Sequence, residues 1–303
     1  MIAALLVIIT NSLVFVIFKL FQRYQVHIKR AIIINYTTAV IISYFAIRKS
    51  IDFNLLWNSK WIIPAIIIGI IYVLNFYVID LCTKNFNLAV TSLSGKISVV
   101  IPVLTGIIIL HESFGWMRVV GILLALLSLF LILKPENSRN SKSFFESPAK
   151  IAKLFIPIAL FLFYGISDAL FQVSQKKLFY SSIYPESCVF VNENEIFVLT
   201  VFSICLIFSL LFTTATKENP IRFYKFRDII GGIALGVVNL IGGFMLLEAV
   251  SQVNNTGVLF AVINISVVIL TTMIGIIYFK EKLRPVNIVG IGIALLALIL
   301  LNI

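Results

Sequence analysis

The stretch SGKISVVIPV (94–103) places an ammonium group inside an otherwise apolar segment. Lys96 is the only charge between Leu88 and Leu110, and Pro102 follows it by six residues. A lysine that faces lipid near the bilayer centre costs at least ~2.5–3.5 kcal/mol, so this side chain is expected to face the protein interior. Proline leaves the carbonyl four residues before it without a donor, here that of Ser98. The pattern favours binding of a substrate carboxylate or phosphate. The alternatives are a structural ion pair and a lysine that extends toward the surface.

Polar residues around Lys96 extend this candidate site. Ser92 lies one helical turn earlier, and Ser98 belongs to an adjoining arc of small polar side chains. Asn264 occupies the corresponding position, 168 residues later, in the similar segment VLFAVINISVV (258–268). Further candidates that could line a cavity are Asn239 and Tyr72.

Asp168 is the second charge within an apolar segment, IPIALFLFYGISDALFQVSQ (156–175). At helical spacing it shares a stripe with Tyr164 and Gln172, and a stripe that is both aromatic and polar suits a wall that faces a ligand. Asp168 could be the counter-ion of Lys96, a proton carrier or the partner of a substrate amine. Competition for such a pair is one way to couple transport to protons. The alternative is a fixed pair that only orients helices.

The other acidic residues near segment ends favour structural roles. Glu193 and Glu195 begin an apolar segment, where the helix dipole stabilises carboxylates. An acidic vestibule for a cationic substrate is the functional alternative. The remaining four are Asp80 and Glu248, expected to be interfacial anchors, and Glu112 and Glu281, expected to cap the helices that follow them.

Composition places these residues in a membrane. The chain is 60% hydrophobic and 12% charged, whereas soluble domains are about 45–50% apolar and ~25% charged. The net charge of +11 could suggest nucleic acid, but the basic residues lie between apolar runs, as in membrane proteins. Two histidines and three cysteines, without a CxxC pair, argue against a metal site or a disulfide framework. No cofactor motif or catalytic constellation is present, so we expect neither a cofactor nor an enzyme.

The apolar segments predict an all-α membrane protein with ten transmembrane helices. The N-terminal segment lacks a basic region and a cleavage site, so it is interpreted as a retained first span. The predicted spans are 1–20, 31–47, 61–81, 89–110, 117–133, 154–173, 190–212, 229–248, 258–279 and 286–303.

The polar stretch 134–153 divides the chain into two halves of five spans, 1–133 and 154–303. The halves share the sequence ISVV at a spacing of 168 residues, which aligns Lys96 with Asn264 and Asp80 with Glu248. An odd number of spans per repeat inverts the second copy in the membrane. Inverted repeats are typical of secondary transporters, whose substrate site lies near the midplane between the copies.

A glutamate directly follows the fourth and the ninth spans, and the next span contains a glycine. The two pairs are Glu112…Gly121 and Glu281…Gly290. This pattern resembles the EamA-type transporters of the drug/metabolite transporter superfamily. The resemblance implies a ten-helix carrier for amino acids, nucleotide precursors, sugar phosphates or drugs, with both termini in the cytoplasm. Lys and Arg are more frequent in the loops after the first, third, fifth, seventh and ninth spans than in the other loops. This excess favours the opposite orientation, with both termini outside the cytoplasm.

These observations together predict a multi-pass protein of the plasma (inner) membrane. We expect an exporter of a small metabolite, amino acid or organic anion that works by alternating access, with the lipid bilayer and the substrate as its partners and no role for nucleic acid. The alternatives are an exporter of lipophilic cations or drugs, and a membrane sensor or scaffold that transports nothing.

Overall fold

The computed structural model describes residues 2–46, 59–111, 115–133, 148–179, 193–215, 225–253, 256–283 and 285–300. Most of these residues lie in helices, and no strand occurs among them. The elements are α1 (Ile2–Arg23), α2 (Ile28–Ala46), α4 (Ile62–Asn85), α5 (Leu88–Lys96), the 3₁₀ turn η1 (Ile97–Val99), α6 (Val100–Ile108), α7 (Trp116–Leu133), α9 (Pro148–Val173), the π-helical turn η2 (Ser174–Leu178), α11 (Glu193–Ala215), α12 (Phe226–Ser251), α13 (Thr256–Ile277) and α14 (Pro285–Leu300).

Seven of the described helical segments are long and apolar enough to cross a membrane: α1, α4, α5 to α6, α9 with η2, α11, α12 and α13. Their outward faces carry large apolar side chains such as Leu5, Leu211 and Ile277, which are 57%, 62% and 71% exposed. Side chains of this kind are stable in lipid and costly in water. The chain is therefore an all-α protein embedded in a membrane. Helices α2, α7 and α14 are shorter, with 19, 18 and 16 residues.

One predicted boundary differs from the structure. Helix α9 begins at Pro148, inside the range 134–153 that the sequence predicts to be a polar linker. Proline is well accommodated in the first turn of a helix, where its missing N–H has no partner to lose. The rest of that range, 134–147, lies outside the described residues, as does Glu112.

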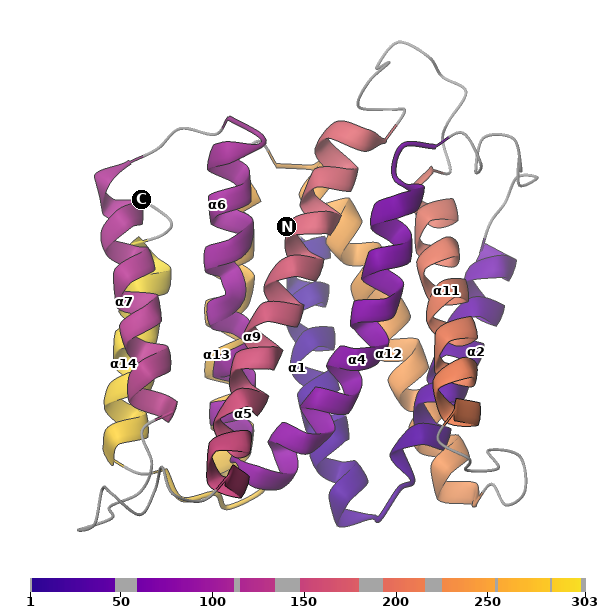
Figure 1. Cartoon of the computed structure of the whole chain (residues 1–303), viewed down its shortest axis with the longest axis horizontal. Coiled ribbons are helices and arrows are strands. Elements are labelled where there is room, and N and C mark those ends of the chain that lie inside the picture. Colours follow the sequence, from indigo (N-terminus) through magenta and orange to yellow (C-terminus); the bar gives the residue numbers. More distant parts are fainter. Residues whose placement is uncertain are drawn as a thin grey trace.

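The helices stand side by side in one bundle (Figure 1). Helices α7 and α14 pack chiefly on each other at one edge of it. Helices α2 and α11 contact each other and cover α12 and α4 on the other side. The centre is built from α1, α4, α5, α9, α12 and α13, so the segments that carry Lys96 and Asp168 are interior ones.

Gly232 and Gly236 on α12 permit its close contact with α2. A Cβ atom on Gly236 would lie 2.7 Å from the carbonyl oxygen of Asn35. A Cβ atom on Gly232 would lie 2.5 Å from Cβ of Ile34. These positions fix how near the two helices approach, and they thereby set the position of the next turn of α12.

Glu281, which the sequence predicts to cap the helix that follows it, contacts two other helices. Its Oε2 accepts a hydrogen bond from the backbone N–H of Leu88, at 2.8 Å, and its Oε1 lies 2.8 Å from Nζ of Lys19. The first N–H groups of a helix lack partners within the helix, and a carboxylate satisfies them well. Glu281 therefore ties the end of α13 to the start of α5 and to α1.

We expect Gly236→Ala to destabilise the protein, although alanine favours helices more than glycine does. The new methyl group would collide with the backbone of α2, and overpacking of this kind costs about 1–3 kcal/mol. Thermal unfolding of the purified protein in detergent measures the effect. Gly292→Ala is the matched control, because a Cβ atom there meets nothing within 4 Å. An equal response of the two variants would contradict this account of α12.

Candidate functional site

A small polar cavity lies in the middle of the bundle. Its volume is about 60 Å³, enough for a few water molecules. Residues from the central turns of five helices, α1, α4, α5, α9 and α12, line it, so it lies about halfway along them. Its lining residues are Thr10, Asn11, Val14, Tyr72, Asn75, Phe76, Lys96, Tyr164, Asp168, Val238, Asn239, Gly242, Gly243 and Leu246.

Lys96 is the last residue of α5 and is only 2% exposed. Its Nζ lies 4.6 Å from the centroid of the Tyr164 ring, a distance at which the ring attracts the cation. Gly95 makes this arrangement possible, because a Cβ atom there would lie 2.8 Å from the Tyr164 ring. Phe15 stacks on Tyr164 from α1, with ring centroids 5.9 Å apart. The ammonium group is thus held against an aromatic wall.

The helix changes its winding directly after Lys96. Residues Ile97–Val99 form a single 3₁₀ turn before α6 begins at Val100. The sequence predicts a disturbance here, since Pro102 cannot donate to the carbonyl of Ser98. A 3₁₀ turn within a long helix often marks a functional hinge.

Asp168 lies one turn after Tyr164 on α9 and is 8% exposed. Among the residues that the structure describes, no basic group lies within 4.0 Å of its carboxylate, and no acidic group lies that close to Nζ of Lys96. Both charges nevertheless line the same cavity. Two buried charges without a direct contact have their desolvation only partly offset. A polar molecule between them would complete the interaction.

Amide and aromatic groups complete the cavity wall. Tyr72 stacks on Phe171 with ring centroids 5.8 Å apart. Nδ2 of Asn239 lies 3.5 Å from Oδ1 of Asn35 on α2. Oδ1 of Asn75 is buried without a hydrogen-bond partner among the described residues. The cavity therefore offers a cation, an anion and an unused amide acceptor within one small volume.

Five predicted site residues thus line the cavity, namely Lys96, Asp168, Tyr164, Asn239 and Tyr72, and four do not: Ser92, Ser98, Gln172 and Asn264. Ser92 lies 2.7 Å from the hydroxyl of Thr271 on α13, and the hydroxyl of Ser98 donates to the carbonyl of Gly95 at 2.5 Å. Gln172 donates to the hydroxyl of Thr256.

Asn264 is buried at 1% exposure, and its Nδ2 has no partner in the described part of the chain. Ser92 and Gln172 bond to side chains of other helices, and Ser98 bonds to the backbone of its own segment, because polar groups find the nearest hydrogen-bond partner rather than a common cavity.

Several lining residues carry no signal in the sequence. Val14, Val238 and Leu246 are apolar residues in apolar helices, so nothing distinguishes the face that meets the cavity. Thr10 has a partial signal, since it precedes Asn11 and lies one turn before Val14. Oγ1 of Thr10 would lie 3.0 Å from a Cβ atom on Gly242, so this glycine admits α1 close to α12.

Glu193, Asp80 and Glu248 have structural partners outside the cavity, whereas Oε2 of Glu195 is buried without a hydrogen-bond partner among the described residues. Glu193 begins α11 and accepts a hydrogen bond from Nε1 of Trp61 at 2.9 Å. Asp80 pairs with Lys84 at 2.5 Å, and Glu248 accepts from Gln252 at 2.6 Å. Within the described ranges, no three His, Cys, Asp or Glu residues gather in a way that could hold a metal ion.

Comparison with known proteins identifies similar chains without naming an activity. The chain is 25% identical over 298 residues to an uncharacterized protein of Haemophilus influenzae (strain Rd), and the match covers 96% of this chain and 94% of that protein. No protein-family model matches the chain. A crystal structure with 11% sequence identity superimposes with a TM-score of 0.61, over 97% of this chain and 96% of the other. That likeness concerns the fold alone.

We expect the buried charges to be energetically coupled. Lys96→Gln leaves Asp168 as an uncompensated carboxylate, and Asp168→Asn leaves Lys96 alone, so each change destabilises the protein. The double variant should lose less than the sum of the two, by about 0.5–3 kcal/mol. The free energies of unfolding of the wild type, the two single variants and the double variant in mixed detergent micelles measure this coupling. The exposed Lys282→Gln is the control. Strict additivity would show that the two charges do not share one site.

Proposed function

We propose that this protein is a secondary transporter that moves a small metabolite, an amino acid or an organic anion by alternating access at the central cavity. The observation that carries the proposal is the pair Lys96 and Asp168. They come from helices in different halves of the chain and face one buried cavity at mid-depth. Charges at this depth are costly and typically mark a substrate or ion pathway.

The proposal includes an inverted repeat of two five-helix units, in which α2, α7 and α14 also cross the membrane. Local contacts support it. Asp80 and Glu248, which the sequence aligns, each bind the residue one turn later, Lys84 and Gln252. The start of α5 meets the end of its counterpart α13 through Glu281, so these two helices run in opposite directions. Opposite directions are expected for inverted copies.

Helix packing supports the same symmetry. If α1, α2 and α4 correspond to α9, α11 and α12, each contact between helices should have a counterpart. Helix α1 packs on α12 as α9 packs on α4, and α2 packs on α12 as α11 packs on α4. Helix α1 also packs on α13 as α9 packs on α5 and α6. The cavity then lies where the two copies meet, between α1, α4 and α5 of one and α9 and α12 of the other.

Alternating access requires elements that change conformation, and two irregular turns are suitable. One is the 3₁₀ turn Ile97–Val99 directly after Lys96, and the other is the π-helical turn Ser174–Leu178 that ends α9. Such turns are often found at functional sites. A cavity of about 60 Å³ is far smaller than the ~300–1,000 Å³ of sites for drug-sized ligands. Binding of a substrate therefore requires the helices around these turns to move apart.

We also propose that the chain is an EamA-type transporter, because of the repeat and the pattern Glu112…Gly121 and Glu281…Gly290. We further propose that it lies in the plasma membrane and exports its substrate. Structural support for the Glu pattern is the contact of Glu281 with α5 across the two halves.

Lipophilic cations are a second candidate class of substrate, favoured by one observation. The aromatic rings of Tyr164, Tyr72 and Phe76 line the cavity beside Asp168. Aromatic faces and a carboxylate together bind organic cations. On this alternative Asp168 binds the substrate and Lys96 is its resting counter-ion.

We expect a panel of amino acids, organic acids and organic cations to identify the class through thermal stability of the detergent-purified protein. A ligand present at about 100 times its Kd stabilises the folded state by about 2.7 kcal/mol. An anion or zwitterion should stabilise the wild type and not Lys96→Gln. The control Lys282→Gln should respond like the wild type.

The same variants in proteoliposomes then test transport of the stabilising compound. Stabilisation by organic cations that survives in Lys96→Gln and disappears in Asp168→Asn would favour the second class. Binding without uptake would contradict transport and favour a sensor. No response from any compound, with both variants merely less stable, would assign Lys96 and Asp168 to structure alone.

A further inference from the structure

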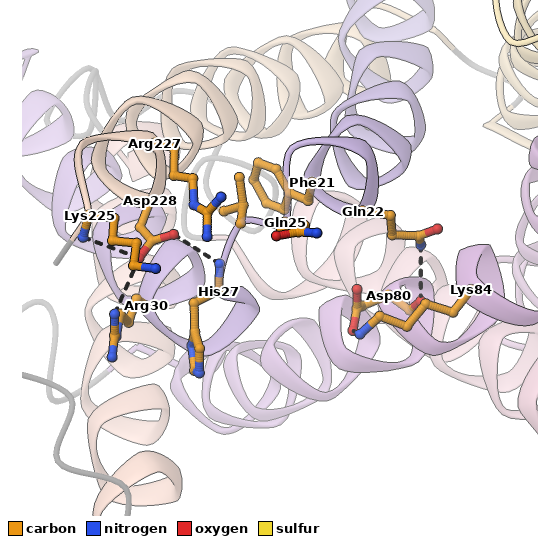
Figure 2. A pocket seen from close by; sticks show the side chains of 11 residues that line it. Phe21, Gln22, Gln25, His27, Arg30, Asp80, Lys84, Lys225, Arg227 and Asp228 are labelled. Atoms are coloured by element: carbon orange, nitrogen blue, oxygen red, sulfur yellow. Dashed lines mark hydrogen bonds and ion pairs between the residues drawn. The ribbon is translucent and has the colours of Figure 1, made fainter. Parts of the chain in front are cut away.

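A second, larger pocket opens at one end of the bundle, which we call the basic vestibule. Its volume is about 720 Å³, and it is formed where α1 ends, α2 begins, α4 ends and α12 begins. Figure 2 shows its lining side chains, with Asp80 and Lys84 on one side and the residues around Asp228 on the other. The charged residues among them are Arg30, Lys84, Lys225, Arg227, Asp80 and Asp228.

Both carboxylates of the vestibule are already bound by protein groups. Asp228 accepts from the backbone N–H of His27 at 2.9 Å and lies 3.4 Å from Nη1 of Arg30. It is 1% exposed. Asp80 pairs with Lys84 at 2.5 Å. The two carboxylates are thus paired with Arg30 and Lys84, and Asp228 also accepts from the backbone N–H of Lys225 at 3.4 Å.

Two cations of the vestibule remain without a carboxylate. Neither Lys225 nor Arg227 has an acidic partner within 4.0 Å among the residues that the structure describes. Nη1 of Arg227 donates to the carbonyl of Tyr24 at 3.1 Å. This bond uses one N–H of the guanidinium group, and its other N–H groups have no partner among the residues that the structure describes. A concave site with unmatched positive charge concentrates anions.

An aromatic layer separates the vestibule from the central cavity. Phe21 lines the vestibule, and Phe76 lines the central cavity. Phe18 lies between them, with ring centroids 5.6 Å from Phe21 and 5.2 Å from Phe76. Phe18 is fully buried. A ligand in the vestibule would therefore make no contact with Lys96 or Asp168.

We propose that the basic vestibule is a second binding site, which takes the anionic group, phosphate or carboxylate, of a small soluble molecule. Arg227 presents a planar fork of donors that matches such groups, and Lys225 adds a mobile point charge. The phosphate of an anionic lipid has the same chemistry, so the source of the anion has to be separated by experiment. The site stands independently of the central cavity and of the transport proposal.

The test measures binding of inorganic phosphate to the full chain in lipid-depleted detergent, by isothermal titration calorimetry. We expect saturable binding that weakens as sodium chloride screens the charges. The double variant Lys225→Gln/Arg227→Gln should bind at least about tenfold more weakly, because it removes both charge-assisted contacts. The matched control is Lys280→Gln/Lys282→Gln, which removes the same charge from exposed residues outside the vestibule.

Lys96→Gln distinguishes this site from the central one, since it should leave phosphate binding within about twofold of the wild type. The melting temperatures of all variants establish that they are folded. A parallel arm measures phosphatidylglycerol retained in nanodiscs by native mass spectrometry. Retention that depends on Lys225 and Arg227, without binding of inorganic phosphate, would assign the site to lipid and overturn the proposal. Equal weakening in the matched control, or no binding at all, would overturn it as well.

Discussion

The structure depends on keeping two opposite charges, Lys96 and Asp168, inside an apolar bundle at mid-depth. Neither charge is stable against lipid, and neither is in direct contact with the other. The bundle therefore has to provide a polar space that both can face. The aromatic wall of Tyr164 and Phe15 holds the ammonium group on one side. Gly95 allows that wall to approach, which explains why a glycine precedes the lysine.

The same requirement shapes the packing farther out. A polar space in the centre persists only if the surrounding helices are held at fixed separations, because apolar side chains would otherwise close it. Helix α12 is fixed against α2 by Gly232 and Gly236, with no room for even a methyl group. One turn later, Asn239 meets Asn35 and lines the cavity. At the end of the bundle, Glu281 joins α13, α5 and α1. Close contacts between helices at the periphery thus keep the polar cavity in the centre open.

The sequence predicts the parts of this arrangement that are conspicuous against an apolar background. A lysine or aspartate within a long apolar run has one stable direction, so residue type and spacing alone assign Lys96, Asp168 and Tyr164 to the interior. Hydroxyl groups are not restricted in this way. Ser92 forms a hydrogen bond with Thr271, and Ser98 forms one with the local backbone. The role of Glu281 is not predictable for another reason. Its partner Leu88 is distant in sequence, and helix N-termini accept carboxylates from any neighbour.

The two spaces in the bundle also constrain the transport path that we propose. The basic vestibule holds about 720 Å³ and the central cavity about 60 Å³, with Phe18 between them. The aromatic layer joins α1 to α4, and Phe21 touches α12 at Gly231, where a Cβ atom would lie 2.8 Å from the ring. Widening the cavity toward the vestibule therefore requires α12 and α1 to separate, which would move Asn239 and Thr10 apart at the same time. If the two halves are inverted copies, as proposed, the contact of α9 with α4 corresponds to that of α1 with α12, and the same movement there would open the cavity in the opposite direction. Under that proposal, two equivalent contacts around one charged centre provide the two openings that alternating access needs.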